Sequence, residues 1–232
     1  MTQILGIVQD GKLIPEETWK QLVSGIENGF DNLETNLERA KRDLSSKFVE
    51  AVKKRASGHF GIMFSGGIDS TLIAFIAKKL GAKFTCYSVG MENSEDLKWA
   101  QQIAKEYGFH LKFKVLTESD FESVIKETMN IIKEPDVTKI TVGAVGLAAS
   151  KIAKEDGINV LFSGLGSEEI FAGYKRHEEA LNGKNYEALH KECWNGMKGM
   201  WARDLVRDYK IGSSLGVSLM TPFLDKDVIK SA

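Results

Sequence analysis

The sequence predicts an α/β fold, a doubly wound parallel sheet with additional N- and C-terminal helices. From Phe60 onward, apolar runs of about five residues alternate with amphipathic runs of about fifteen residues. Such alternation builds parallel βαβ units, whose sheet is covered by helices on both faces. The length of 232 residues suffices for one such domain with a real core.

The expected elements follow in chain order. We predict strands at 60–64, 84–89, 111–115 and 159–162, and helices at 71–80, 94–107, 119–133 and 138–156. Helix ends are marked by Gly81, Gly108 and Gly157. Ser119 followed by Glu122 has the spacing of a capping box. Beyond residue 173 the pattern is helical throughout.

The segment before the alternating region predicts a short strand at 4–8, a helix from Pro15 to about Gly29, and a second helix at 31–55. We therefore divide the chain into an appendage at 1–30 and a nucleotide-binding domain at 31–232. The opening helices are expected to lean on the sheet.

Composition excludes several function classes. The formal net charge is -1, so no basic excess points to nucleic acid or to a membrane surface. Cys86 and Cys193 lack metal-ligand spacing, which argues against zinc and against a disulfide framework. The sequence shows no signal peptide and no long apolar segment, so we expect a soluble cytoplasmic protein.

Histidines and tryptophans give no separate site. The histidines form no ligand or triad spacing, and we expect surface or packing roles for them: His59, His110, His177 and His190. The tryptophans are expected to be packing anchors: Trp19, Trp99, Trp194 and Trp201.

The most informative motif is Ser-Gly-Gly-Ile-Asp-Ser at 65–70, between a predicted strand and a predicted helix. Its glycines let the backbone approach a ligand, and the helix N-terminus favours an anion, above all phosphate. A Walker A loop would need a lysine, which is absent here. Asp69 would repel phosphate unless Mg²⁺ lay between them. The alternative is an ordinary strand-to-helix turn capped by Asp69 or Ser70.

A second glycine-bearing loop at 163–169 follows the predicted strand 159–162. Small residues leave room for a ligand, and Glu168 and Glu169 could hold a cation. Ligands of open parallel sheets bind at the carboxyl ends of the strands, where the winding direction switches. Two such loops favour a shared Mg²⁺–phosphate site, while a solvated helix start remains the alternative reading of the two glutamates.

These motifs resemble a known family. The string at 65–70 resembles the signature of the PP-loop ATP pyrophosphatases, and SGLGSEEIFAGY at 163–174 is similar to the synthetase domain of asparagine synthetase. The similarity extends in order through 89–97, 136–138 and the PFLD string at 222–225, so it covers about 31–225.

The resemblance implies roles for individual residues. A pyrophosphate cradle would consist of Ser65, Gly66, Gly67 and Ser70, and the adenosine pocket would be lined by Val89, Ser163 and Gly164. Asp69 and Glu168 match the two acidic positions that bind Mg²⁺, and Thr138 matches the acceptor-binding stretch. The family chemistry is activation of a carboxylate by ATP as its acyl-adenylate, release of pyrophosphate and attack of an amine.

The chain departs from the family pattern at four places. Thr2 stands where the glutaminase nucleophile would be a cysteine, and the rest of that domain is absent from the sequence. Leu165 replaces the glutamate that handles the amine, and Thr141 replaces an arginine that grips a carboxylate, for which Lys139 could compensate. The family's pyrophosphate-clamping lysine lies well beyond the PFLD string, and this sequence stops at Ala232; Lys175, Arg176 or a residue of a partner subunit could substitute for it.

The sequence is thus compatible with three candidate functions. The first is an asparagine synthetase-like ligase that uses ATP, Mg²⁺ and a small carboxylate, with ammonia, an amine or a separate glutaminase as the nitrogen source. The second is an ATP-binding regulatory or partner subunit without turnover. The third, a tRNA-modifying enzyme, needs a basic face or an RNA-binding appendage that the sequence lacks. Helices beside an incomplete site are compatible with a homodimer.

Overall fold

The computed structural model describes residues 7–9, 11–29 and 34–232. The chain divides into two compact units. Unit 1 comprises Met1–Arg55, Gly164–Arg203 and Thr221–Ala232, and unit 2 comprises Ala56–Ser163 and Asp204–Met220. The boundary predicted at residue 30 stays a prediction, because residues 30–33 lie outside the described ranges.

Unit 2 contains a five-stranded sheet in the order β5-β4-β3-β6-β7, and every pairing in it is parallel. Its strands are β3 (His59–Met63), β4 (Lys83–Met91), β5 (Leu111–Leu116), β6 (Val160–Phe162) and β7 (Ser218–Met220). Its helices are α3 (Ile68–Lys79), α4 (Glu95–Tyr107), α5 (Glu118–Ile132), α6 (Val137–Glu155) and α10 (Val206–Leu215). A π-helical turn, η2 (Trp201–Leu205), precedes α10. The predicted doubly wound sheet is confirmed.

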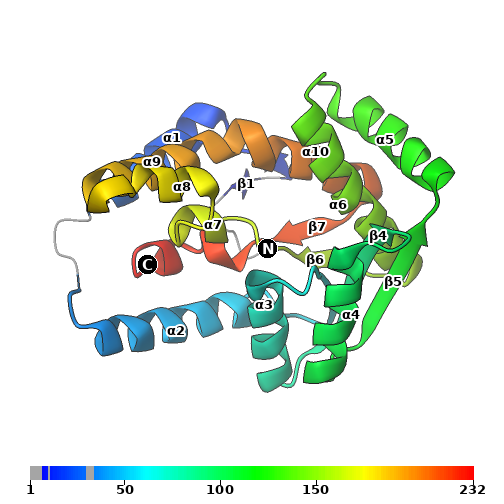
Figure 1. The fold of residues 1–232 in the computed structure, drawn as a ribbon, viewed down its shortest axis with the longest axis horizontal. Helices are drawn as coiled ribbons and strands as arrows, with labels where there is room; N and C mark the ends of the chain where they lie inside the picture. Colours follow the sequence, from blue (N-terminus) through cyan, green and yellow to red (C-terminus); the bar gives the residue numbers. More distant parts are fainter. Residues whose placement is uncertain (1–6, 10, 30–33) are drawn as a thin grey trace. The chain divides into compact units, whose positions relative to one another are not determined.

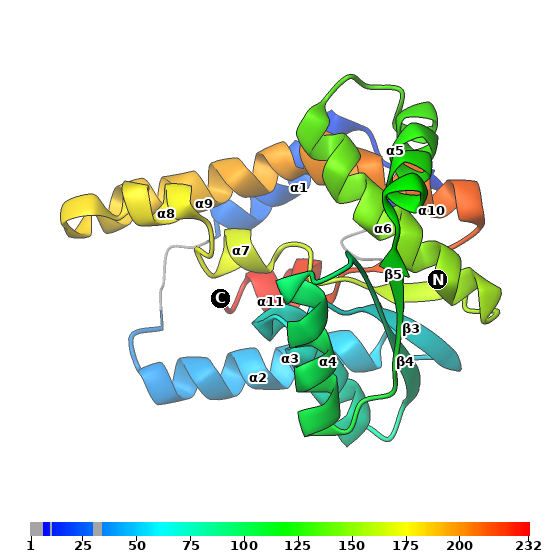
Figure 2. The ribbon, with the colours of Figure 1, turned by 45° about the vertical axis from the view of Figure 1, so that its right-hand side comes forward.

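Helices cover both faces of this sheet, as Figures 1 and 2 show for α4 and α6. On one face, a Cβ at Gly90 of β4 would meet Leu97 and Ser94 at the start of α4 within about 3.1 Å. On the other face, Tyr87 of β4 packs with Ala153 of α6. Alternate residues of a strand point to opposite faces, so these contacts place α4 and α6 on opposite sides.

The winding direction reverses between β3 and β6. The chain runs outward from β3 to β4 and β5, and then returns through α5 and α6 to β6 on the other side of β3. Gly61 and Ile62 of β3 pair with Leu161 and Phe162 of β6. The carboxyl ends of these two neighbouring strands are therefore the switch point at which such sheets bind ligands.

Unit 1 is mainly helical. Its elements are the hairpin β1 (Val8–Gln9) and β2 (Lys12–Leu13), α1 (Glu16–Glu27), α2 (Leu37–Lys53), α7 (Ser167–Ile170), α8 (Lys175–Ala180), η1 (Asn182–Lys184), α9 (Tyr186–Met200), η3 (Pro222–Leu224) and α11 (Lys226–Ile229). Trp19 is fully buried, and its indole N–H donates to the Met197 carbonyl at 2.9 Å. The buried Arg55 guanidinium donates to the Asp225 carboxylate at 2.9 Å, which ties α2 to the PFLD string.

Most predicted elements are found within one to three residues of their expected ends. Part of the strand predicted at 4–8 and the start of the helix predicted at 31–55 lie outside the described residues. Gly108 caps α4 in the left-handed conformation, as its position predicts. Among the described residues, every helix is too short or too polar to cross a lipid bilayer.

Two expectations are wrong. The capping box of α5 is formed by Thr117 and Asp120 rather than by Ser119 and Glu122, because the helix already begins at Glu118. The region beyond residue 173 is not wholly helical, because β7 pairs in parallel with β6. β7 is only three residues long, so its sequence has too few positions to show strand periodicity.

The buried Cys86 on β4 should react slowly with alkylating reagents. Burial raises the pKa of its thiol to about 12, so the reactive thiolate is scarce near neutral pH. We expect iodoacetamide at pH 8 to alkylate Cys86 in the folded protein at least about a thousandfold more slowly than an exposed thiol. Peptide mass spectrometry before and after urea unfolding measures this. Rapid alkylation of the native protein would contradict the burial of β4.

Candidate functional site

The turn after β3 brings together four of the predicted site residues. The Gly67 N–H donates to Ser65 Oγ at 3.2 Å, and Ser65 Oγ lies 3.3 Å from Ser70 Oγ. Ser70 Oγ in turn donates to the Gly67 carbonyl at 3.3 Å. Gly66, between them, has a φ of 75°. Ser65, Gly66, Gly67 and Ser70 thus form one small turn at the carboxyl end of β3.

The start of α3 lacks a side-chain cap. Gly67 is its N-cap residue and has no side chain to accept from the first-turn N–H groups. In contrast, α4, α5 and α6 of the same unit are capped by Ser94, Thr117 and Asp136. The Ser70 hydroxyl, one of the two alternative caps, instead donates to the Gly67 carbonyl. An N-terminus without a side-chain cap, behind a glycine turn, suits a bound phosphate.

Asp69 lies in the first turn of this helix and is half-buried. A carboxylate gains from the positive end of the helix dipole, yet it would repel a phosphate bound at the same place. A divalent cation held between the two removes that conflict. Among the described residues, no group of three or more His, Cys, Asp or Glu side chains could hold a metal by itself. Mg²⁺ in phosphate sites is generally held by one or two carboxylates together with phosphate oxygens and water.

The second loop starts beside the first. Ser163 follows β6 directly, and its N–H donates to the Met220 carbonyl of β7 at 2.8 Å. Within unit 1, Gly166 has a φ of 100° and precedes α7, and it supplies no side-chain cap. A Cβ at Gly166 would lie 2.5 Å from a Leu224 methyl group, so the turn packs tightly against the PFLD string. Gly164 accepts from the Ser167 N–H at 3.3 Å.

The two glutamates of this loop have different surroundings. Glu169 is 1% exposed, and its carboxylate accepts from the guanidinium groups of Arg203 and Arg176. Glu168 is half-buried; its carboxylate accepts from the Ser167 hydroxyl at 2.9 Å, and its stem packs against Gly173. Glu169 is thus neutralised inside unit 1, and Glu168 remains the candidate cation ligand of the pair.

The Lys139 and Thr141 side chains, which follow Thr138, already have hydrogen-bond partners within unit 2. Thr138 is exposed in the first turn of α6, and the Thr141 hydroxyl donates back to the Val137 carbonyl at 2.9 Å. Lys139 Nζ lies 2.5 Å from Glu134 Oε2. Hydrogen bonds from Lys139, and then from Lys210, lower the pKa of Glu134. Lys139, expected to compensate for the missing arginine, already has a carboxylate partner.

Other predicted residues are placed as follows. Val89 is half-buried near the end of β4 and packs against the apolar cluster of α5, α6 and α10. Arg176 contacts Glu169 and Glu192 and stacks on the Tyr174 ring, whereas Lys175 is 86% exposed. Lys175 Nζ itself lies 3.9 Å from Glu179 Oε1, so both candidate replacements for the family's clamping lysine have carboxylate neighbours.

The predicted residues fall into both units. Unit 2 holds Ser65, Gly66, Gly67, Asp69, Ser70, Val89, Thr138 and Ser163, and unit 1 holds Gly164 and Glu168. Whether Asp69 and Glu168 share a cation stays a prediction.

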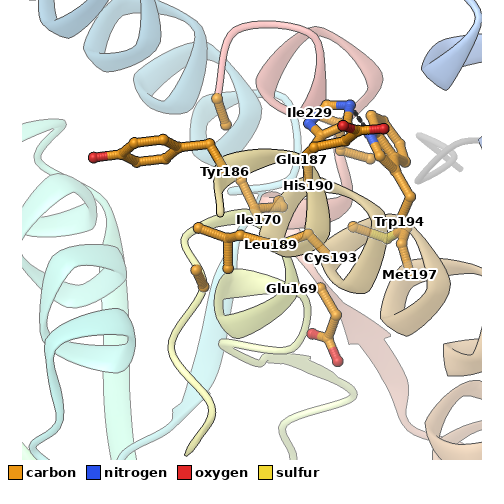
Figure 3. A pocket seen from close by; sticks show the side chains of 12 residues that line it. Glu169, Ile170, Tyr186, Glu187, Leu189, His190, Cys193, Trp194, Met197 and Ile229 are labelled. Atoms are coloured by element: carbon orange, nitrogen blue, oxygen red, sulfur yellow. Dashed lines mark hydrogen bonds between the residues drawn. The ribbon is translucent and has the colours of Figure 1, made fainter. Parts of the chain in front are cut away.

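Two features of the structure leave no signal in the sequence. Trp99 on α4 is 49% exposed rather than a buried anchor, and its indole N–H donates to the Gly66 carbonyl at 3.0 Å. Unit 1 also holds a cavity of about 510 Å³ beside α9, shown in Figure 3. Leu189, Cys193 and Met197 line it, and the Trp194 indole N–H donates to His190 Nε2 at 2.9 Å at its side. No motif signals either feature, because both arise from contacts between turns or elements.

A substitution at Gly66 tests the geometry of the first turn. In Gly66→Ala, the new Cβ would lie 2.9 Å from Ala100 Cα, in addition to the strain of a positive φ. Gly81→Ala is the matched control, because Gly81 has a φ of 66° and nothing within 4 Å of its Cβ position. We expect Gly66→Ala to lower the free energy of unfolding in urea by about 1–3 kcal/mol more than the control does. Equal losses would contradict the close approach of α4.

The buried His177 predicts a pH dependence of stability. Its ring is fully buried, Nδ1 accepts from the Tyr174 N–H at 3.2 Å, and burial lowers its pKa. The unfolded chain therefore takes up a proton first as the pH falls below about 6.5, which destabilises the folded state. We expect His177→Gln to lose less unfolding free energy than the wild type between pH 7.5 and 5.5. His110→Gln, at an exposed position, is the control, and an unchanged slope in His177→Gln would contradict this.

Comparison with known proteins agrees with the motifs. Residues 43–188 match the family model described as asparagine synthase. A Methanocaldococcus jannaschii protein named as a glutamine-hydrolyzing asparagine synthetase is 38% identical over 215 residues, which are 89% of this chain and 40% of that protein. Asparagine synthetase 2 of Lotus japonicus is 33% identical over 202 residues, which are 82% of this chain and 34% of that protein.

Among solved structures, NMN synthetase from Francisella tularensis is 16% identical, with a TM-score of 0.41, over 61% of this chain and 59% of that chain. The chain spans 40% or less of the length of the two asparagine synthetases. Because the family model matches more than half of its residues, this protein belongs to the asparagine synthase family.

Proposed function

We propose that this chain binds ATP with Mg²⁺ at the turn after β3, activates a carboxylate as its acyl-adenylate, and forms an amide with ammonia or another amine. The observation that carries this proposal is the start of α3, which has no side-chain cap and lies behind Gly66 and Gly67 at the switch point of the sheet. Membership of the asparagine synthase family supports the same chemistry.

In this proposal the two loops bind different parts of MgATP. Ser65, Gly66, Gly67 and Ser70 hold the β- and γ-phosphates through N–H and hydroxyl groups, and Asp69 and Glu168 hold Mg²⁺. Mg²⁺ supplies neutralisation of the charge on the departing pyrophosphate. Glu168 is five residues beyond Ser163, which directly follows the strand next to β3. The residues that line the adenosine would be Val89, Ser163 and Gly164.

The proposed reaction has two steps, adenylation of the carboxylate and attack of the amine. A substrate carboxylate oxygen attacks the α-phosphorus of ATP, the bond from that phosphorus to the oxygen bridging to the β-phosphate breaks, and pyrophosphate leaves. A neutral amine then attacks the acyl carbon, the bond from that carbon to the phosphate oxygen breaks, AMP leaves, and the proton lost by the nitrogen passes to solvent water. The role of the protein is to place the carboxylate in line with the leaving pyrophosphate.

The side chains near Thr138 do not offer the substrate an arginine-like contact for a carboxylate. Thr141 is bonded to its own helix and Lys139 to Glu134, so neither offers the bidentate donor pair that an arginine gives to a carboxylate. Thr138, exposed on α6, is the remaining predicted contact for the acid. We therefore propose a small carboxylate substrate held by hydroxyl and backbone groups. The nitrogen would come from free ammonia, an amine or a separate glutaminase, and an assembly as a homodimer would fit this scheme.

A second candidate is an ATP-binding subunit that regulates a larger amidotransferase without turnover of its own. Leu165 favours it, because a leucine side chain cannot take the proton that the attacking amine must lose.

Exchange of labelled pyrophosphate into ATP separates the two candidates. A panel of mono- and dicarboxylic acids and amino acids is offered with ATP, Mg²⁺ and ammonium, and AMP and ADP are quantified. We expect exchange and AMP with at least one acid. ATP binding without AMP across the panel would support the regulatory subunit, and production of ADP would contradict activation of the carboxylate as an acyl-adenylate.

A variant pair tests the role of Asp69. Asp69→Asn removes the negative charge of a proposed Mg²⁺ ligand, and we expect exchange to fall at least about a hundredfold. Glu118→Gln is the control, because it neutralises a first-turn carboxylate of α5 in the same unit. Equal rates in Asp69→Asn and the control would rule out Asp69 as a ligand.

A further inference from the structure

Trp99 on α4 is half-exposed, yet it makes a hydrogen bond to the turn after β3. Its side chain is 49% exposed, and its indole N–H donates to the Gly66 carbonyl, 33 residues earlier in the chain, at 3.0 Å. A half-exposed tryptophan gains less from the hydrophobic effect than a buried one. Figures 1 and 2 both show α4, which carries Trp99, beside α3, which follows the turn.

The bond fixes the orientation of one peptide group. In a trans peptide the carbonyl and the following N–H point in opposite directions. With the Gly66 carbonyl held on the α4 side by Trp99, the Gly67 N–H faces the other way, toward Ser65 Oγ at 3.2 Å. That inner side is where the hydroxyl groups of Ser65 and Ser70 meet.

Glycines leave this peptide free to rotate unless something holds it. Gly66 and Gly67 carry no Cβ, so a flip of the peptide between them meets little steric resistance. A flipped peptide would turn a carbonyl oxygen, with its partial negative charge, toward the hydroxyl groups and any bound phosphate. The backbone of Ala100 and the ring of Trp99 lie against Gly66, at 2.9 Å and 3.1 Å from the position of a Cβ.

We propose that Trp99 is a positioning residue that keeps the Gly66–Gly67 peptide in the orientation that binds phosphate, with its N–H inward and its carbonyl outward. This inference rests on the proposed function of the turn and adds a residue to it. Trp99 acts through the backbone and need not contact the nucleotide.

Trp99→Phe tests the proposal, because it keeps an aromatic ring against the turn and removes only the N–H donor and one ring. We expect the affinity for MgATP, measured by calorimetry, to fall about three- to tenfold, the size expected for one lost hydrogen bond. We also expect faster hydrogen–deuterium exchange in peptides covering residues 64–68 of the protein without nucleotide. At saturating ATP the pyrophosphate-exchange rate should recover, since the loss lies in binding.

Trp201→Phe is the matched control. Its indole N–H donates to the Ile14 carbonyl at 2.8 Å, a bond of the same kind within unit 1. We expect this variant to change neither MgATP affinity nor exchange at residues 64–68. Circular dichroism confirms that both variants are folded.

The outcomes separate this inference from the proposed function. If the wild type fails to bind MgATP, the proposed function is wrong, and the hydrogen–deuterium exchange alone decides the role of Trp99. Exchange at residues 64–68 that is the same in Trp99→Phe and in the wild type overturns the inference. An MgATP affinity unchanged in Trp99→Phe, when the wild type binds, also overturns it.

Discussion

The peptide backbone at Gly66 lies so close to α4 that no side chain fits between them, and this close approach constrains the turn at 65–70 on which the proposed site depends. β3 is bonded on both sides, to β4 and β6, so the chain leaves the sheet at a rigid point. It then passes Ala100, where a Cβ would be 2.9 Å away, and enters α3 without a side-chain cap. A β3 end that is held firmly, followed by N–H groups without a cap from the N-cap side chain, is the physical basis on which we propose an anion site.

The second loop, at 163–169, also depends on a glycine with a positive φ, which here allows the loop to pack against the PFLD string. Gly166, with a φ of 100°, lets α7 start close to Leu224 of the PFLD string. The adjacent carboxylates then differ in their surroundings, because two arginines neutralise Glu169 inside unit 1, whereas Glu168 accepts a hydrogen bond from the neighbouring Ser167 hydroxyl. A buried ion pair of this kind is costly to break, so it anchors the loop from which Glu168 extends.

The sheet could be predicted from sequence because its central strands β3 and β6 are largely buried apolar runs and its helices end at glycines such as Gly108. β7 could not, because three residues carry no periodicity and its partner β6 lies 56 or more residues earlier in the chain. That Ser65, Gly67 and Ser70 meet in one turn could be predicted because they lie within six consecutive residues, and their role in binding stays a prediction. Trp99 was missed, since its bond joins residues 33 apart, and the pairing of Lys139 with Glu134 was missed because sequence does not show which cations are already bound.

The central claim, that Asp69 and Glu168 hold one Mg²⁺ on a bound ATP, is tested most directly by a double-mutant cycle on MgATP affinity. Calorimetry would compare the wild type, Asp69→Asn, Glu168→Gln and the double variant. If the two carboxylates share one ion, the double variant should bind about as weakly as the weaker single variant, because either change already impairs the same site. Losses that add in full, or wild-type protein that does not bind MgATP, would contradict the shared site.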